Sequence, residues 1–366
     1  MSGLSALQVA SATLASLPHI TAKRLRRTIE HFGDPVAALE AVLHGQAHRA
    51  LRGTDDDKLR IGREWCRAAD PDAIAAALER RGTHVWVEGD DDFPFTRPVI
   101  DQPYVLFAEG AAPAALSRPR AAIVGTRSAT PHGLADAAEL GAALAAAGAT
   151  VISGLAIGID GAAHEGALRA NGEVVGVVAT GLDVEYPRRH KTLYQRVRAQ
   201  GVVVSEHWFG VRPDRARFPV RNRIIAALCD VLVVVEATQT GGARITADAA
   251  ARYDRPVLAM PGSRRNPAAT GCNELLRDGA EPLLDPSDVL QAIELTFGGR
   301  AQWARPSPPP ESPTAKAVLR ALGGEPATVD DLIVRTRLSA ADTITAVRDL
   351  ETSGAVHRQR GFVWPR

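Results

Sequence analysis

The sequence predicts an α/β protein built on a doubly wound, mostly parallel sheet, with a helical module before it and a winged helix after it. Apolar runs rich in Val and Ile recur from Ala121 onward, and they are apolar throughout rather than alternating. Strands buried on both faces require this pattern. The stretches between the runs have helical periodicity and often end at glycine. Residues 119–296 are therefore predicted to form one domain with helices on both faces of the sheet.

Composition indicates a globular cytoplasmic protein. The chain has 366 residues, 45% hydrophobic, and a formal net charge of +1, which predicts about two or three domains at roughly 100–200 residues each. No apolar run reaches the about 18 residues of a membrane helix, and the first residues lack the basic start of a secretory signal. Cys66, Cys229 and Cys272 are odd in number and far apart, so neither a disulfide framework nor a zinc site is expected. We expect no membrane contact, metal or cofactor, and we interpret Cys229 and Cys272 as core residues.

Two segments precede the predicted sheet domain. Residues 1–80 are rich in Ala, Leu and Arg at helical spacing and are predicted to form a small helical module. Residues 81–118 carry short apolar runs between several prolines. They are predicted to form an irregular bridge with one or two strands.

Two further segments follow the sheet domain. Residues 297–313 are rich in Gly and Pro and are predicted to be a linker. Residues 314–366 contain helix-start signals at Thr328 and Ser339, and Gly354 is placed to stop a helix before a hairpin. This order predicts a winged-helix domain.

Three predicted strands run into glycine-rich turns at the start of helices. The turns are GTRS at 125–128, SGLAIGIDG at 153–161 and TGGA at 240–243. In open α/β sheets ligands bind beyond the carboxyl ends of the strands, where helix N-termini point free N–H groups outward. One such turn is more simply a tight connection, but three on one edge predict a row of backbone donors for phosphate.

The sequence lacks the fingerprints of common nucleotide enzymes. It contains no phosphate-binding G-x-x-x-x-G-K-[ST] loop, and its turns do not spell a dinucleotide G-x-G-x-x-G with an acidic residue at the expected distance. Asp160 and His164 lie four apart on one predicted helix and could form an acid/base pair or hold a metal. A capping Asp and a packed His are the favoured interpretation, so we predict a protein that is not an enzyme.

Basic residues are concentrated between Arg188 and Arg223. This segment has ten basic against two acidic side chains, a net +8, and Tyr186, Tyr194, Trp208 and Phe218 are interleaved with them. Arginines with stacking side chains hold single strands without reading their sequence. We interpret Arg196 and Arg198 as a solvated helix face, and the FPVRNR run at 218–223 as functional.

Six motifs in order resemble the DNA-processing protein A family, also called DprA or Smf, over essentially the whole chain. The motifs are IVGTRSATPHG (123–133), SGLAIGIDGAAHEGAL (153–168), GLDVEYP (181–187), FPVRNRIIAAL (218–228), TGGARITADAA (240–250) and PGSRRNPAATGCNELLRDGA (261–280). The resemblance implies an extended Rossmann-like domain with a helical module and a winged helix. It also implies a single-stranded DNA-binding recombination mediator that loads RecA recombinase onto incoming DNA in natural transformation. The resemblance further implies a homodimer, for which Leu275 and Leu276 offer an apolar pair.

The resemblance and the glycine turns together define the expected DNA contacts. They are Arg127, Ser153, Gly154, Gly158, Arg221, Asn222, Arg223, Gly241, Gly242 and Arg244. Position 157, often basic in the family, is Ile157 here, so nearby arginines such as Arg244 would have to compensate. His19 and Thr21 replace glycines of a helix-hairpin-helix, which predicts little DNA contact from the helical module.

The predicted recognition helix of the winged helix has the wrong charge for DNA. Residues 340–351 contain Arg348 as their only basic side chain, against Asp342, Asp349 and Glu351. We therefore interpret residues 314–366 as a protein-interaction or regulatory module. Two other functions stay open: a Rossmann-fold enzyme acting on a nucleotide or nucleoside phosphate, and a purely structural partner of the recombination machinery.

Overall fold

The computed structural model describes residues 3–297 apart from 96, 98, 112–115 and 117–118, and residues 312–365 apart from 324–325, 353–354 and 360. The chain divides into two compact units, Met1–Gln302 and Trp303–Arg366. Most of the predicted linker and the predicted helix stop at Gly354 lie outside the described residues.

The first part of the large unit is helical, as predicted. Its helices begin at good N-caps: Ser5 forms a capping box with Gln8, Thr54 accepts from Asp57 N, and Asp70 precedes Pro71. The elements are α1 (Ala6–Ser16), α2 (Ala22–Phe32), α3 (Pro35–Leu43), the 3-10 turn η1 (Ala47–Ala50), α4 (Asp55–Ala68) and α5 (Pro71–Arg81). These elements are called the helical module below.

The turn between α1 and α2 keeps a glycine-like backbone without a glycine. His19 has a φ of +56°, which is uncommon for a residue with a side chain. Thr21 caps α2 by accepting from Arg24 N, and the Arg24 guanidinium donates to His19 O at 2.9 Å. Side-chain hydrogen bonds therefore support a turn that glycine would form at less cost.

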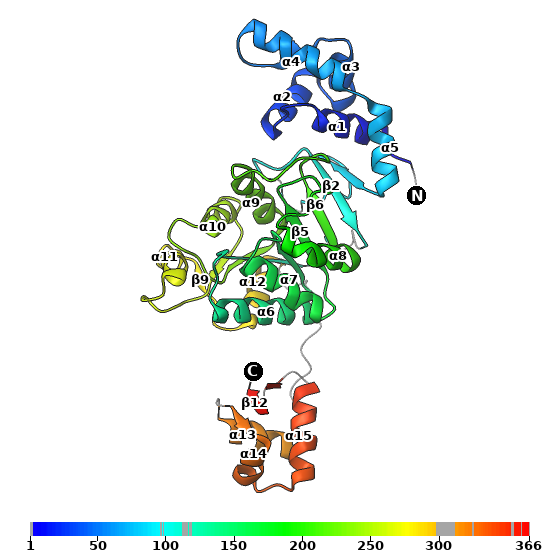
Figure 1. The fold of residues 1–366 in the computed structure, drawn as a ribbon. Helices are drawn as coiled ribbons and strands as arrows, with labels where there is room; N and C mark the ends of the chain where they lie inside the picture. The colour runs from blue at the N-terminus through cyan, green and yellow to red at the C-terminus, as the bar shows by residue number, and fades with distance from the viewer. Residues whose placement is uncertain are drawn as a thin grey trace. The chain divides into compact units, whose positions relative to one another are not determined.

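A nine-stranded sheet forms the centre of the large unit (Figure 1). Its order is β1-β2-β6-β5-β4-β3-β7-β8-β9. The strands are β1 (His84–Val87), β2 (Val105–Gly110), β3 (Arg120–Val124), β4 (Thr150–Ser153), β5 (Val174–Val178), β6 (Val202–Ser205), β7 (Val231–Val234), β8 (Val257–Ala259) and β9 (Glu281–Pro282). The strands from β3 to β8 match the predicted apolar runs, and their central residues are buried on both faces.

The segment at 81–118 contributes directly to this sheet. Strand β2 pairs antiparallel with β6, and β1 pairs antiparallel with β2. All other pairings in the sheet are parallel. The predicted bridge therefore extends the sheet by two strands at one edge. The helical module packs on this extension, where Gln8 Nε2 donates to Val85 O at 2.9 Å and Arg26 pairs with Glu88 at 2.8 Å.

Helices cover both faces of the sheet, which confirms the doubly wound prediction. Figure 1 shows α9 and α10 together on one side, and α6, α7 and α12 together on the other. The remaining elements are α6 (Pro131–Ala146), α7 (Ile159–Arg169), η3 (Arg188–His190), α8 (Lys191–Gln200), α9 (Arg217–Leu228), α10 (Gly242–Arg252), η4 (Pro267–Ala269), α11 (Thr270–Arg277) and α12 (Pro286–Phe297). Among the described residues, we find no helix with the length and apolar character needed to cross a membrane.

The small unit has its own hydrophobic core and a three-stranded antiparallel sheet. Its elements are α13 (Pro313–Leu322), β10 (Ala327–Thr328), α14 (Val329–Thr336), α15 (Ala340–Thr352), β11 (Val356–Gln359) and β12 (Phe362–Pro365). Thr328 and Ser339 accept from Asp331 N and Asp342 N, so both predicted N-caps are confirmed. Three helices followed by a hairpin make a winged helix, as predicted.

Candidate nucleic-acid interface

A groove of about 470 Å³ opens where the strand order reverses. The chain builds β3 to β6 in one direction and then crosses to place β7 on the other side of β3. The groove lies between the turn after β3, at 124–127, the turn after β7, at 237–243, and the first half of α9, at 215–222. This is the topological switch point at which open α/β sheets bind ligands.

The protein fills one of the three predicted anion sites with its own carboxylate. At the start of α6, Glu236 accepts hydrogen bonds from Thr130 N at 2.8 Å and from Thr130 Oγ1 at 2.7 Å. Glu236 comes from the end of β7, and it is 7% exposed. The negative charge that a helix N-terminus favours is therefore already present at α6.

The second turn also has its donors engaged. Ser153 Oγ donates to Ile123 O at 2.6 Å and is fully buried, while Gly154 N donates to Asp160 Oδ2 at 3.1 Å. The predicted phosphate contacts of Ser153 and Gly154 are therefore not available in this structure. Glycine is needed at 154 for a steric reason, because a Cβ there would lie 2.6 Å from Arg221 Nη2 and 2.7 Å from Asp160 Oδ2.

Gly158 has a structural role beside the groove. It precedes α7 with a φ of +88°, and a Cβ there would lie 2.3 Å from Thr126 O. Only glycine allows this conformation and this contact without strain. The start of α7 therefore packs against the turn that carries Arg127.

The third turn is the one that leaves a helix N-terminus open. Gly241 precedes α10 and makes no side-chain cap, and Gly241, Gly242 and Ala243 line the groove. Asn222 holds this turn from α9, since its Nδ2 donates to Gly242 O at 3.1 Å. The first N–H groups of α10 are thus the backbone donors best placed for a phosphate.

Arg221 lies below the groove surface. It is 5% exposed, and its Nη1 donates to Gly154 O at 2.9 Å and to Val177 O. Burial raises the pKa of the neighbouring Asp160 carboxyl and lowers the pKa of Arg221, and the attraction between the two groups opposes both shifts. Arg221 therefore joins the second turn to β5 and adds positive potential from beneath.

Two expected DNA-binding arginines are neutralised by carboxylates. Arg223 Nη2 lies 2.5 Å from Glu206 Oε2, and its Nη1 donates to Asp101 O at 2.6 Å. Arg244 pairs with Glu274 and lies 3.6 Å from Asp278. Neither residue has the free guanidinium that the sequence predicts, and Arg244 cannot supply the charge that Ile157 lacks.

A cationic and aromatic cluster does occupy the groove wall. The Arg127 guanidinium carbon lies 4.6 Å from the centre of the Phe218 ring, and the Phe218 and Tyr186 rings lie 5.8 Å apart. Arg127 is exposed, and within the described part of the chain no carboxylate pairs with it. Tyr186, Pro187 and Phe218 also line a smaller pocket, together with Tyr194. Burial raises the pKa of Tyr194 to about 12, so its hydroxyl stays protonated.

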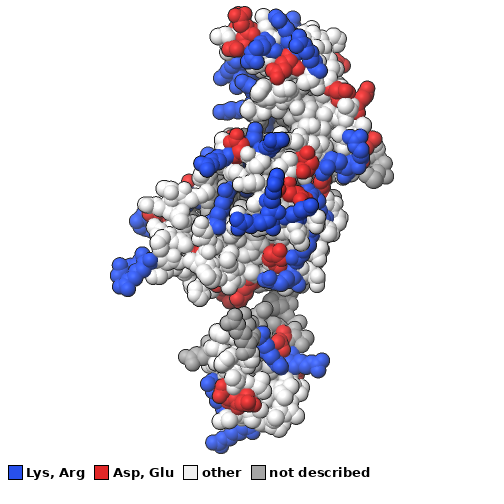
Figure 2. All heavy atoms as spheres, viewed as in Figure 1, with Lys and Arg blue, Asp and Glu red and all other residues white. Residues whose placement is uncertain are grey.

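The basic segment divides into paired and unpaired charges. Arg196, Arg198 and Arg223 pair with Glu165, Glu185 and Glu206. Six other cations have no carboxylate partner among the described residues: Arg188, Arg189, Lys191, Arg212, Arg215 and Arg217. Figure 2 shows Lys and Arg atoms gathered over the middle of the large unit, with smaller groups of Asp and Glu among them.

The list of expected DNA contacts omits Arg215, Phe218 and Tyr186, although Phe218 lies in the 218–223 run that the sequence analysis interprets as functional. Arg215 and Phe218 line the groove, and Tyr186 lies beside them. The signal was present as basic and aromatic residues interleaved between 186 and 223. The role of Glu236 could not be predicted from the sequence, because its partner Thr130 is 106 residues away.

The buried titratable groups near the sheet have structural environments. His164 is fully buried, and burial lowers its pKa to about 3, so it is neutral at pH 7. Cys229 and Cys272 are also fully buried, and burial raises the pKa of each thiol to about 12. The core interpretation of both cysteines is confirmed.

The fold and the groove define the chain as a doubly wound α/β protein with a ligand groove at its switch point and a C-terminal winged helix. Family models agree with this description. Residues 84–294 match DNA recombination-mediator protein A, and residues 302–361 match the DprA winged helix domain. The chain belongs to the DNA recombination-mediator protein A (DprA) family.

Relatives cover most of the chain. A putative DNA processing protein DprA from Mycobacterium tuberculosis is 37% identical over 347 residues, which is 89% of this chain and 86% of the relative. The crystal structure of DprA from Streptococcus pneumoniae matches with a TM-score of 0.65 and 29% identity, over 79% of this chain and 98% of that one. DNA processing protein A from Helicobacter pylori, studied for its single-stranded DNA binding mode, matches with a TM-score of 0.50 and 28% identity, over 58% and 95%.

Proposed function

We propose that this chain binds single-stranded DNA in the groove between β3 and β7 and delivers it to RecA recombinase during natural transformation. It acts without catalysis in the cytoplasm. The observation that carries the proposal is the Arg127–Phe218–Tyr186 cluster beside the open N-terminus of α10. The cluster offers a cation and stacking faces, and the helix offers N–H groups to a phosphate. None of these groups reads a base sequence.

The electrostatics of the groove support a polyanionic ligand. Arg127 and Arg215 line it without carboxylate partners among the described residues, and Arg221 adds charge from below. Related proteins bear names that refer to DNA processing, and one related structure concerns single-stranded DNA. A DNA ligand fits both the charge and the aromatic surface.

A binding titration tests the proposal. Labelled single-stranded and double-stranded oligonucleotides of the same sequence are titrated at several salt concentrations. We expect preference for the single strand and a decline of log K against log salt of about 0.7 per phosphate neutralised. Equal affinity for the duplex, or an affinity that salt does not change, would contradict the proposal. Incubation with labelled nucleotides in parallel tests for an enzyme acting on a nucleotide or nucleoside phosphate.

We also propose that the chain forms a homodimer, but Leu275, one of the two leucines expected at the interface, lies in the core of its own chain. Leu275 is 7% exposed and packs into the core of its own chain, and the half-buried Leu276 packs against the same core. Leu275 is therefore not free to contact a partner, whereas part of the Leu276 side chain stays exposed. Sedimentation at micromolar concentration measures the state, and a monomer throughout would remove this part of the proposal.

A further inference from the structure

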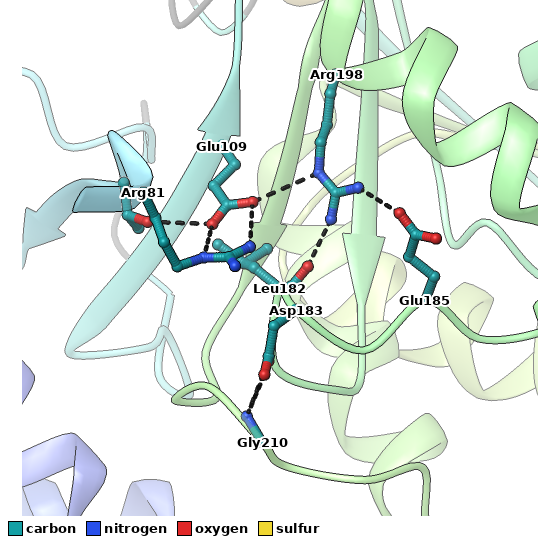
Figure 3. A network of polar contacts seen from close by, with 8 residues as sticks. Arg81, Glu109, Leu182, Asp183, Glu185, Arg198 and Gly210 are labelled. Carbon is teal, nitrogen blue, oxygen red and sulfur yellow. Dashed lines mark hydrogen bonds and ion pairs between the residues drawn. The ribbon is translucent and has the colours of Figure 1, made fainter. Parts of the chain in front are cut away.

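A polar network joins the helical module to the loop that carries Tyr186. Figure 3 shows Glu109 of β2 between the guanidinium groups of Arg81 and Arg198. Arg81 Nε lies 2.7 Å from Glu109 Oε1, and Arg198 Nε lies 3.5 Å from Glu109 Oε2. Arg81 is the last residue of α5, and Arg198 belongs to α8. The Glu109 side chain is only 9% exposed, so these contacts are shielded from water.

Helix α8 holds the loop between β5 and η3 at three points. Arg198 Nη1 binds Glu185 Oε1 at 2.7 Å, and Arg198 Nη2 donates to Leu182 O. From the same helix, Tyr194 Oη donates to Tyr186 O at 2.8 Å. Two of these contacts are made to main-chain oxygens, so they fix the path of the backbone.

The Tyr186 ring depends on this backbone for its position. Tyr186 is 41% exposed. Its ring contacts the Phe218 ring, at 5.8 Å between ring centres, and few other side chains fix its position. The Arg198 guanidinium is committed to Glu185, Leu182 and Glu109 and presents no free edge to a strand. The sequence interpretation of Arg198 as a solvated helix face is therefore wrong.

We propose that Arg198 is a positioning residue for single-stranded DNA binding, which holds the Tyr186 ring against Phe218 so that the two rings present one stacking surface to a base beside Arg127. Glu109 fixes Arg198 and links it to Arg81, so the helical module contributes to binding without touching DNA. This inference rests on the proposed function. It adds that part of the affinity comes from residues that never contact the strand.

The test uses the full chain and an oligothymidine of about 20 nucleotides, longer than the roughly 4–16 nucleotides that such sites cover. Arg198→Lys keeps the positive charge but loses the planar guanidinium group, whose two terminal nitrogens bind Glu185 and Leu182 O at the same time. Arg196→Lys is the matched control on the same helix, because its pair with Glu165 is more open to solvent than the contacts of Arg198. We expect Arg198→Lys to bind about five- to tenfold more weakly, as expected for part of one base stack. Arg196→Lys should stay within about twofold of the wild type, because a half-exposed pair that keeps its charge contributes little.

Two readouts separate positioning from a direct phosphate contact. On a strand of the same length built from abasic sites, Arg198→Lys should match the wild type, because no base is available to stack. In a Tyr186→Ala background, Arg198→Lys should add no further loss.

Tyr194→Phe provides a second variant in case Arg198→Lys lowers the melting temperature strongly. It removes one hydroxyl and one hydrogen bond to Tyr186 O, and it should show the same dependence on bases. A loss that persists on the abasic strand, or that adds to the loss from Tyr186→Ala, overturns the positioning role alone. Failure of the wild-type chain to bind any single strand overturns the proposed function and this inference together.

Discussion

Helix α8 carries three basic residues, and so does the loop before α9 together with the first residue of α9, but the two regions present different charge to a ligand. In α8, Arg196 and Arg198 are paired with glutamates, and Lys191 has no carboxylate partner among the described residues. In the loop and the first residue of α9, Arg212, Arg215 and Arg217 have no carboxylate partner among the described residues. A polyanion gains from cations that are not already neutralised. Charge counted along a sequence therefore overstates what the folded surface offers.

The largest expected effect comes from breaking a paired arginine. Arg223→Ala leaves the Glu206 side chain, 9% exposed, without its partner. The free energy of unfolding should fall by roughly 2–4 kcal/mol, because a buried charge loses its compensation. Chemical denaturation measures this change.

Single-strand affinity should change little in the same variant, by less than about threefold. Arg196→Ala is the control, since its half-exposed pair with Glu165 should contribute less than about 1 kcal/mol of stability. A large loss of single-strand affinity with an unchanged free energy of unfolding would show that Arg223 contacts DNA.

Arg127→Ala should show the opposite behaviour. Single-strand affinity should fall by roughly 1–3 kcal/mol, because a charged contact to phosphate and a cation over Phe218 are both lost. The melting temperature should stay close to that of the wild type, since Arg127 is exposed. Equal losses for Arg127→Ala and Arg196→Ala in a titration would show that the groove is not the site.

Arg215→Ala tests the comparison between the two regions directly. The slope of log K against log salt should become shallower by about 0.7, as for one phosphate contact fewer. Arg196→Ala should leave the slope unchanged, because Glu165 already neutralises that charge. If both slopes change alike, ion pairing on this surface opens when DNA binds.

Removal of the winged helix should have the smallest effect. The small unit has its own core, so deletion of residues 312–366 leaves the large unit intact. Helix α15 carries more acidic than basic side chains, and single-strand affinity should stay within about threefold, under about 1 kcal/mol. A tenfold loss in the truncated chain would show that the winged helix touches the strand.

The parallel part of the fold was predictable from the sequence. Strands buried on both faces have to be apolar throughout, and β3 to β8 follow that rule. The edge strand β1 and its neighbour β2 were expected only as strands of a bridge. Their runs, HVWV and VLFAEG, are short and lie among turn residues, so only their pairing in three dimensions identifies them as sheet.

The candidate site was predictable in place but not in its contacts. Glycine turns located the switch point, because turns of this kind follow parallel strands. Which N–H groups and guanidinium groups remain free depends on partners distant in the chain. Glu206 lies 17 residues from Arg223, and Glu274 lies 30 residues from Arg244. No local sequence pattern predicts ion pairs between residues this far apart in the chain.

Glu236 has a consequence for the route that a bound strand can take. Its carboxylate occupies the N-terminus of α6 and mimics there the phosphate that the neighbouring α10 leaves room for. In the proposed complex, the Glu236 carboxylate disfavours a phosphate at the start of α6, and the open N-terminus of α10 favours one. The phosphates of a strand bound as proposed would therefore lie at α10 rather than at α6.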